Sequence, residues 1–192
     1  MVGRRGSRGR WFMGAPKELP VHPISARIKK SVFDILRPRL EGARVLDLYA
    51  GTGAVGLEAL SRGAQSAFFV DRDKRCLAVV EENMKRLDLA AKGRACYGDV
   101  LQDLSWIPFR AGVPDFDIIY MGPPYRDAEN RMLAYSTPTL ARVAEANLLA
   151  PGGWALLQRY KKEKVELPPG LERFREERYG DTDVEFLRRP AQ

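Results

Sequence analysis

The stretch VLDLYAGTGAVG, residues 45–56, contains the change of periodicity that decides the fold. Its first half is apolar apart from Asp47, which is typical of a strand buried in a parallel sheet. Its second half is rich in glycine and leads into an apolar-periodic segment that reaches Ser61, so a tight turn and then a helix are expected. A strand, a glycine-rich turn and a helix in this order begin an α/β unit.

Strand and helix patterns alternate along the rest of the chain. Ser25 is expected to cap a helix that runs to Leu36 and is stopped by Pro38. The alternation predicts a parallel α/β sheet with right-handed crossovers, to which a C-terminal hairpin adds an antiparallel edge. The other expected elements are strands at 44–49, 66–70, 94–97, 116–120 and 154–159, helices at 74–88 and 132–147, a turn at 151–153, and hairpin strands at 174–179 and 184–188.

The charge of the chain is concentrated at its N-terminal end. The net charge is +7, and residues 1–44 hold eleven Lys or Arg against three acids, so this segment carries +8 and the remainder −1. A basic arm on a near-neutral body favours a polyanionic partner, with nucleic acid first and an anionic membrane second. The alternative is a tail that only aids solubility.

Composition narrows the class of protein further. The 192 residues suffice for one sizeable domain, and no apolar run is long enough to cross a bilayer. The arginines of the N-terminus are not followed by the apolar core of a secretory signal. Cys76 and Cys96 have no metal-binding spacing and His22 is the only histidine, so we expect buried thiols in a reducing cytoplasm and no metal site.

Acidic residues and glycines follow the predicted strands, where ligands bind in parallel sheets. Gly51 to Gly56 matches the GxGxxG pattern of nicotinamide or flavin sites, and Asp71 lies where a ribose-binding acid falls. Asp47 argues against a pyrophosphate, which seeks backbone N–H groups without a nearby carboxylate. S-adenosylmethionine, which has a ribose and a cationic methionine but no phosphate, fits better. Asp71 would then accept from the ribose and Asp99 from the adenine amino group, although either acid alone could simply cap a turn.

These residues and several others resemble a known family. Residues 45–59 resemble the first motif of class I methyltransferases, and most closely the RsmD family, which methylates the exocyclic N2 of a guanine in small-subunit ribosomal RNA. The resemblance implies a class I methyltransferase (Rossmann-like) fold: α/β, with a mostly parallel seven-stranded sheet, an antiparallel C-terminal hairpin and helices on both faces. It is also carried by Gly9-Arg10, by PISARIKKSVFDIL at 23–36 with Arg27, Lys29 and Phe33, by 60–64, by 70–73 and by Tyr179-Gly180-Asp181-Thr182.

The resemblance implies a role for each candidate residue of a methyltransferase domain at 25–192 that follows a basic arm at 1–24. In the family that the chain resembles, the catalytic motif is an Asp or Asn, two prolines, and a Tyr or Phe. Its aromatic ring stacks on the target base. The Asp or Asn side chain and a rigid backbone carbonyl accept hydrogen bonds from the amino group of that base. The implied partner is small-subunit RNA or the assembling 30S particle, bound by a monomer in the cytoplasm. The implied residues are Asp47, Tyr49, Gly51, Gly53, Asp71, Arg72, Asp99 and Val100 for S-adenosylmethionine, Gly122, Pro123, Pro124 and Tyr125 for catalysis, and Arg8, Arg10, Arg27, Lys29 and Lys30 for RNA.

The chain departs from the family's catalytic motif at Gly122, where Asp or Asn is expected. A charge-assisted acceptor contributes about 1.5–3 kcal/mol, which is roughly one to two decades of rate. We expect an active enzyme that relies on the backbone carbonyls of Gly122 and Pro123. The alternatives are an amino-methyltransferase acting on DNA adenine or protein glutamine, and an RNA-binding or assembly protein that retains the cofactor pocket. The role of Arg27, toward RNA phosphate or the methionine carboxylate, stays open.

Overall fold

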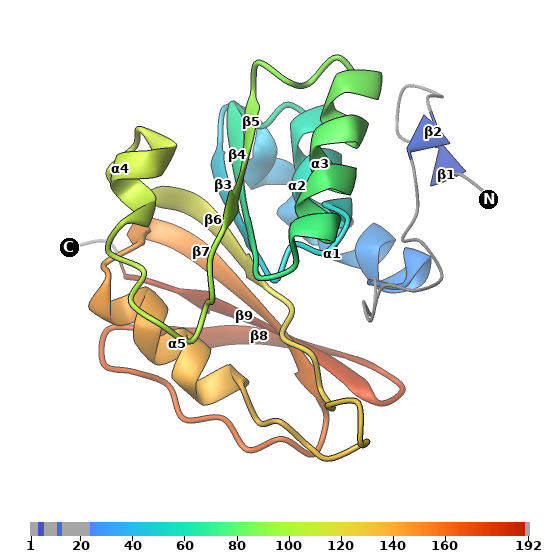
Figure 1. Ribbon diagram of the computed structural model, residues 1–192. Coiled ribbons are helices and arrows are strands. Elements are labelled where there is room, and N and C mark those ends of the chain that lie inside the picture. The colour runs from blue at the N-terminus through green and yellow to red at the C-terminus, as the bar shows by residue number, and fades with distance from the viewer. Residues whose placement is uncertain (1–3, 6–10, 13–23, 191–192) are drawn as a thin grey trace. The chain divides into compact units, whose positions relative to one another are not determined.

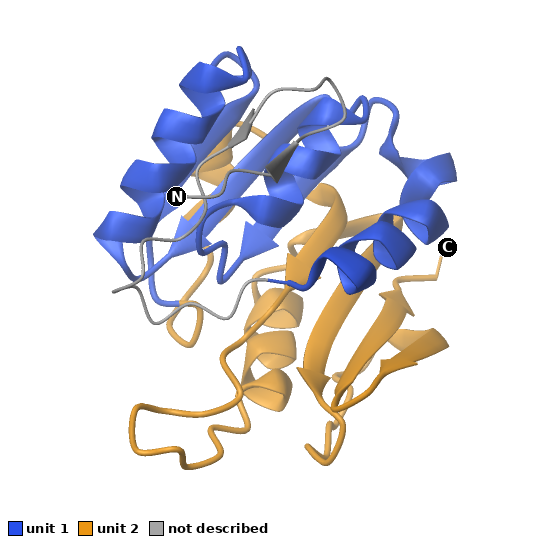
Figure 2. Cartoon of the chain, turned by 90° about the vertical axis from the view of Figure 1, so that its right-hand side faces the viewer, with its two compact units in different colours: residues 1–99 blue, residues 100–192 orange. Residues whose placement is uncertain are grey.

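The computed structural model describes residues 4–5, 11–12 and 24–190 (Figure 1). Two short strands, β1 (Arg4–Arg5) and β2 (Trp11–Phe12), pair in antiparallel fashion. The predicted RNA-binding residues Arg8 and Arg10 lie outside the described residues. The chain divides into two compact units, residues 1–99 and 100–192, which Figure 2 distinguishes by colour. The boundary predicted between arm and domain at residue 24 stays a prediction.

The first unit contains a three-stranded parallel sheet with the strand order β5-β4-β3. Helices α2 and α3 pack on these strands, and the strands bury a continuous apolar layer that includes Leu46 and Phe69. Cys76 of α3 is buried as expected, whereas Cys96 on the edge strand β5 is only half-buried. The elements of this unit are α1 (Ala26–Leu40), β3 (Arg44–Leu48), α2 (Ala54–Ser61), β4 (Ser66–Asp71), α3 (Lys74–Arg86) and β5 (Gly93–Tyr97).

Helix α1 begins as predicted but ends later. The Ser25 hydroxyl accepts a hydrogen bond from the Ile28 amide, 3.3 Å away, which confirms the cap. The predicted stop at Pro38 is wrong, because the helix continues through this residue to Leu40. Pro38 lies in the last turn, where its ring costs only one backbone hydrogen bond. Leu40 is 2% exposed, and its burial keeps that last turn in place.

The second unit has the strand order β6-β7-β9-β8, in which β6 and β7 are parallel and the other pairs antiparallel. Two predictions require correction here: α5 begins four residues later than expected, and the segment 151–153 is an irregular part of β7 instead of a separate turn. A short helix that was not predicted, α4, occupies the connection before β6. The elements are α4 (Ile107–Ala111), β6 (Phe116–Met121), α5 (Ser136–Glu145), β7 (Leu149–Tyr160), β8 (Glu172–Tyr179) and β9 (Thr182–Arg188).

The predicted fold class is confirmed. The two units together contribute a mixed set of seven strands, mostly parallel, that ends in an antiparallel C-terminal hairpin. Within the part of the chain that the structure describes, none of the helices combines the length and the apolar character that a membrane span requires.

Candidate active site

The turn between β3 and α2 adopts an uncommon backbone conformation. Tyr49, Gly51 and Gly53 have φ values of 60°, 54° and 79°, which lie in the left-handed region. Glycine adopts this region without cost, whereas a bulky residue such as Tyr49 is strained there by about 1–3 kcal/mol. The Gly53 amide donates to the Ala50 carbonyl at 2.8 Å and closes the turn. The turn therefore brings bare backbone to the carboxyl end of β3, where a ligand can approach it closely.

Asp47 lies beneath this turn, at the N-terminus of α2. It is 1% exposed, and its Oδ2 accepts a hydrogen bond from the Gly56 amide at 2.9 Å. Burial raises the pKa of Asp47 to about 8, against the opposing effect of the Gly56 hydrogen bond and with a smaller upward contribution from the charge of Asp71. Asp47 is therefore mostly protonated at neutral pH, and a nearby cation would favour its ionised form.

Gly56 itself has a steric role. A Cβ at this position would lie 2.3 Å from Cε1 of Phe69, so only glycine lets α2 pack this closely on β4. The third glycine of the motif is thus needed for helix–sheet packing, and its amide at the same time holds Asp47.

Asp71 ends β4 and faces the same turn. Its Oδ2 accepts from the Gly51 amide at 2.8 Å, and its Oδ1 accepts from the Asp73 amide at 2.9 Å. The residue is partly exposed, and an ionised carboxylate has roughly four acceptor sites, so capacity remains for two hydroxyl groups of a ribose. The turn-capping role considered from the sequence is confirmed by these two hydrogen bonds, and the ribose-binding role of Asp71 stays a prediction.

The remaining predicted cofactor residues follow β4 and β5 in the chain. The Gly98 amide donates to the Asp71 carbonyl at 3.1 Å, which ties the turn after β5, with half-buried Asp99, to the end of β4. Arg72 is exposed beside it, and Val100 is buried in the second unit. The first unit therefore brings together a carboxylate for a ribose, a second acid for an adenine amino group and an open backbone turn, a set that fits S-adenosylmethionine.

The Gly-Pro-Pro-Tyr segment directly follows β6 in the second unit. Pro123 is buried and Gly122, Pro124 and Tyr125 are partly exposed. The Tyr125 hydroxyl donates to Oγ1 of Thr182 at 3.4 Å, and its ring centroid lies 6.3 Å from that of Tyr160. Burial is the main cause that raises the pKa of Tyr125, so its hydroxyl stays protonated. The ring is thus fixed from two sides.

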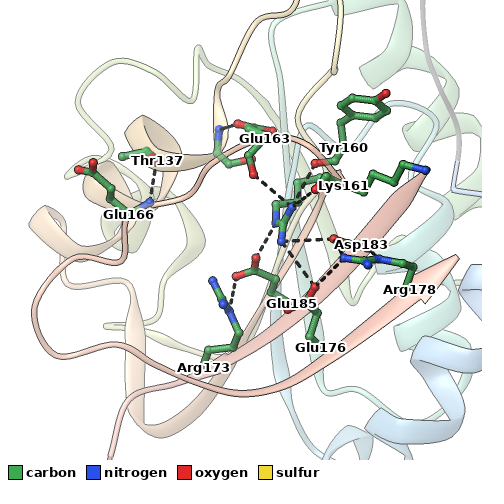
Figure 3. A network of polar contacts seen from close by, with 12 residues as sticks. Thr137, Tyr160, Lys161, Glu163, Glu166, Arg173, Glu176, Arg178, Asp183 and Glu185 are labelled. Carbon is green, nitrogen blue, oxygen red and sulfur yellow. Dashed lines mark hydrogen bonds and ion pairs between the residues drawn. The ribbon is translucent and has the colours of Figure 1, made fainter. Parts of the chain in front are cut away.

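A network of buried charges lies along β7 and β9, the strands that carry Tyr160 and Thr182. Arg159 is 7% exposed, and its guanidinium contacts Glu185 at 2.5 Å and Asp183 at 3.3 Å, both of which are fully buried. Figure 3 shows these carboxylates with Glu176 around the same point, and Arg173 and Arg178 pair with Glu185 and Asp183 at 2.8 and 2.7 Å.

The same guanidinium also fixes the chain beyond β7. Nη1 of Arg159 donates at 3.2 Å to the carbonyls of Tyr160, Lys161 and Glu163. This segment carries the Tyr160 ring that lies against Tyr125. The network therefore links the closing hairpin to the Gly-Pro-Pro-Tyr segment.

The predicted basic residues of α1 differ in their surroundings. Arg27 is exposed, whereas the side chain of Lys29 is only 15% exposed and pairs with Glu58 of α2 at 3.3 Å. Lys30 pairs with Asp34 at 2.9 Å on the helix surface. The charge of Lys29 is therefore partly used within the unit, and the RNA-binding role of these three residues stays a prediction.

Several residues around Tyr125 were not predicted. Tyr160, Thr182 and Gln158 lie far from the motif in sequence, and only the family likeness of 179–182 pointed toward one of them. The structure gives that likeness a reason, because Gly180 forms the hairpin turn with a φ of 67° and Thr182 reaches Tyr125.

The glycine-rich turn with its acids and the Gly-Pro-Pro-Tyr segment after β6 define a class I methyltransferase. The chain belongs to the family described as "Conserved hypothetical protein 95", which matches residues 6–188. It is 32% identical to "Putative rRNA methyltransferase YlbH" of Bacillus subtilis, over 87% of each chain, and 29% identical to "Ribosomal RNA small subunit methyltransferase D" of Escherichia coli K12, over 96% of this chain and 89% of that one. The fold is shared with the solved structure "Putative methyltransferase yhhF" of Escherichia coli, with a TM-score of 0.76, 23% identity, and coverage of 96% and 94%. The predicted family resemblance is confirmed.

The chain is an S-adenosylmethionine-dependent methyltransferase. When bound, S-adenosylmethionine supplies a methyl group made electrophilic by its sulfonium. The residues of this chain that would hold it remain a prediction: Asp71 would accept from the ribose, Asp99 would accept from the adenine, and the open backbone at Gly51 and Gly53 would lie along the methionine part.

Proposed function

We propose that the protein methylates the exocyclic N2 of a guanine in small-subunit ribosomal RNA. The observation that carries the proposal is the Tyr125 ring, which follows two rigid prolines at the end of β6 and is held by Thr182 and Tyr160. A flat ring fixed in this way suits stacking on a base. The relatives named ribosomal RNA methyltransferases support RNA as the substrate class.

The target amine needs help, because its lone pair is conjugated with the ring of the base. The prolines fix the backbone after Gly122, since neither can rotate about φ. The carbonyls of Gly122 and Pro123 then accept hydrogen bonds from the amine and orient it, so catalysis rests on alignment and requires no covalent intermediate. The base has to leave its stacked position to enter such a site.

The substrate is small-subunit RNA, free or in an assembling 30S particle, and the enzyme acts as a monomer in the cytoplasm, where this RNA is assembled. Among the predicted RNA-binding residues that the structure describes, Arg27, exposed on α1, is the one best suited to a phosphate contact. The net charge of +7 favours the approach of a polyanion.

Nucleoside mass spectrometry tests the substrate directly. Ribosomal RNA from a deletion strain is expected to lack one N2-methylguanosine that returns with the wild-type gene, and mapping of the RNA fragments locates the guanine. The purified protein with labelled S-adenosylmethionine is then offered small-subunit particles, naked RNA, duplex DNA and protein. An unchanged RNA and label found only in DNA or protein would overturn the proposal, and no transfer at all would favour a binding protein.

The proposed stacking role of Tyr125 is tested with two variants. Tyr125→Phe keeps the ring and loses the hydroxyl bond to Thr182, so we expect most of the activity to remain. Tyr125→Ala removes a stacking surface worth roughly 1–3 kcal/mol, so the rate is expected to fall by about one to two decades while affinity for S-adenosylmethionine is kept. Equal rates for the Ala and Phe variants would contradict the role.

A further inference from the structure

Arg126 directly follows Tyr125, and its guanidinium is held in one place. The residue is exposed, and its Cζ lies 5.8 Å from the centroid of the Tyr160 ring, within the range of a cation–π contact. Its Nη1 donates a hydrogen bond to the Asn130 carbonyl at 2.7 Å. Tyr160 is also the ring whose centroid lies 6.3 Å from that of Tyr125. One aromatic side chain therefore joins this guanidinium to the ring that is proposed to stack on the base.

The guanidinium is carried by a small closed loop that begins directly after Tyr125. The Leu133 amide donates to the Tyr125 carbonyl at 3.1 Å, and a β-bridge closes the ends of the loop. Inside the loop, the Asp127 carboxylate accepts hydrogen bonds from the amide and from Nε of Arg131, at 2.8 and 2.6 Å. The position of Arg126 beside Tyr125 is thus fixed by hydrogen bonds within the chain itself.

The two arginines of this loop differ in their electrostatic surroundings. Arg131 pairs with Asp127 at 2.6 Å and with Glu129 at 3.1 Å. Arg126 has no carboxylate partner among the residues that the structure describes, where it contacts only a ring and a carbonyl. A guanidinium has five N–H donors, so donors remain for a further acceptor. An exposed arginine of this kind suits a phosphate, which a guanidinium binds through two parallel hydrogen bonds.

We infer that Arg126 binds a phosphate of the RNA backbone next to the target nucleotide and thereby positions the base against Tyr125. The inference rests on the proposed function, because it concerns the same RNA. A base that leaves its stack rotates about its backbone, so a phosphate contact beside the ring fixes the strand from which the base extends. Arg126 is a positioning residue in this account and takes no part in the transfer of the methyl group.

Two variants that change the charge equally test the inference. Arg126→Gln and Arg131→Gln each remove one positive charge from the same loop, but only the first removes the proposed contact. Their kinetics are measured on small-subunit RNA, naked or in particles, whichever the wild type methylates. Arg126→Gln is expected to raise KM for RNA roughly 3- to 10-fold and to keep kcat and KM for S-adenosylmethionine within about 2-fold. Arg131→Gln, at an exposed ion pair, is expected to change each value by less than about 2-fold.

The salt dependence of binding gives a readout that a purely structural role would not move. With S-adenosylhomocysteine present, affinity is measured for the RNA fragment that contains the target guanine. Loss of one phosphate contact should reduce the slope of log affinity against log salt by about 0.7–1 in Arg126→Gln. Arg131→Gln should keep the wild-type slope, and so should Arg126→Lys, which retains the charge. Replacing the target guanosine by inosine should weaken binding by the same factor in wild type and Arg126→Gln, because a phosphate contact does not read the base.

The outcomes separate this inference from the proposed function. If the wild type methylates the RNA and Arg126→Gln matches Arg131→Gln in KM and in salt slope, Arg126 does not bind a phosphate. A raised KM with an unchanged salt slope assigns Arg126 a role in the structure of the loop and also overturns the inference. A wild type that does not methylate ribosomal RNA refutes the proposed function itself, and the inference with it.

Discussion

Replacing Asp47 with Asn tests the electrostatics of the cofactor turn. Burial raises the pKa of Asp47 from 3.8 to about 8, so at pH 7 the folded protein binds a proton that the unfolded chain releases. Each pH unit above the ordinary pKa costs about 1.4 kcal/mol, or about 4 kcal/mol at pH 7. Asn avoids this cost, and its carbonyl can still accept from Gly56. After an allowance of about 1–3 kcal/mol for the new amide donor, we expect Asp47→Asn to be more stable by roughly 1–3 kcal/mol at pH 7.

The direction in which stability changes with pH follows from the raised pKa of Asp47. Wild-type stability from Asp47 is greatest below about pH 4 and falls as the pH rises toward 8, because the folded state binds more protons than the unfolded state in that window. Urea unfolding of both proteins at pH 5, 6, 7 and 8 should show a difference that widens by about 1.4 kcal/mol per pH unit.

Asp103→Asn is the matched control, since hydrogen bonds from Ser105 lower the pKa of that exposed carboxyl. The stabilisation that Asp103 provides is already complete above the ordinary pKa of an aspartate. The difference in free energy of unfolding between Asp103→Asn and wild type should therefore not grow between pH 5 and 8. A constant difference for Asp47→Asn over the same range would mean that Asp47 is ionised in the folded protein, and the reasoning from its burial would be refuted.

The proton that Asp47 binds in the folded protein can also report ligand binding. If the ammonium of S-adenosylmethionine lies near Asp47, its charge favours the ionised carboxylate, so binding at pH 7 releases a proton. Calorimetry in two buffers of different ionisation enthalpy measures that release. The wild type should release a fraction of a proton that Asp47→Asn does not, whereas equal release by both proteins would place the ammonium elsewhere.

Two further predictions concern packing. Gly56→Ala places a methyl group 2.3 Å from the Phe69 ring, so urea and thermal unfolding should show a free energy of unfolding lower by about 1–3 kcal/mol. Adding Phe69→Leu in the same chain should restore part of that loss, and an unchanged stability of Gly56→Ala would contradict the close helix–sheet contact. Arg159→Met removes the central cation beside buried Glu185 and should lower the free energy of unfolding by roughly 3–5 kcal/mol. Arg142→Ala, at an exposed ion pair, should lower it by less than about 1 kcal/mol, and similar losses for the two variants would show that burial of the network is unimportant.

The parts of the site that were predictable share a local cause. Asp47 lies within one apolar run that periodicity identifies as a strand and Asp71 directly follows another, and parallel strands bring their carboxyl ends to one edge. Helix α4 was missed because a five-residue helix is too short to show a period of 3.6. The stop at Pro38 was wrong because the burial of Leu40, a tertiary effect, outweighs a local preference.

The surroundings of Tyr125 could not be read from the sequence, because they depend on strand register. Tyr160 of β7 is paired with Thr182 of β9, and this register alone puts both beside Tyr125. A slip of one residue would turn Thr182 to the other face and replace it with Asp183. The local pattern of either strand, taken alone, does not specify that alignment.

The buried network supplies a reason for that alignment to be unique. Ion pairs in a core add little net stability over apolar residues, because the desolvation of the charges offsets their attraction. They are, however, intolerant of displacement: in a slipped register Asp183 and Glu185 would point away from Arg159, which would then be buried without its carboxylates. We infer that the charges make the alternative registers unfavourable. The hairpin at the end of the chain is therefore held in the one alignment that fixes Tyr125, which makes it part of the candidate site as well as the edge of the sheet.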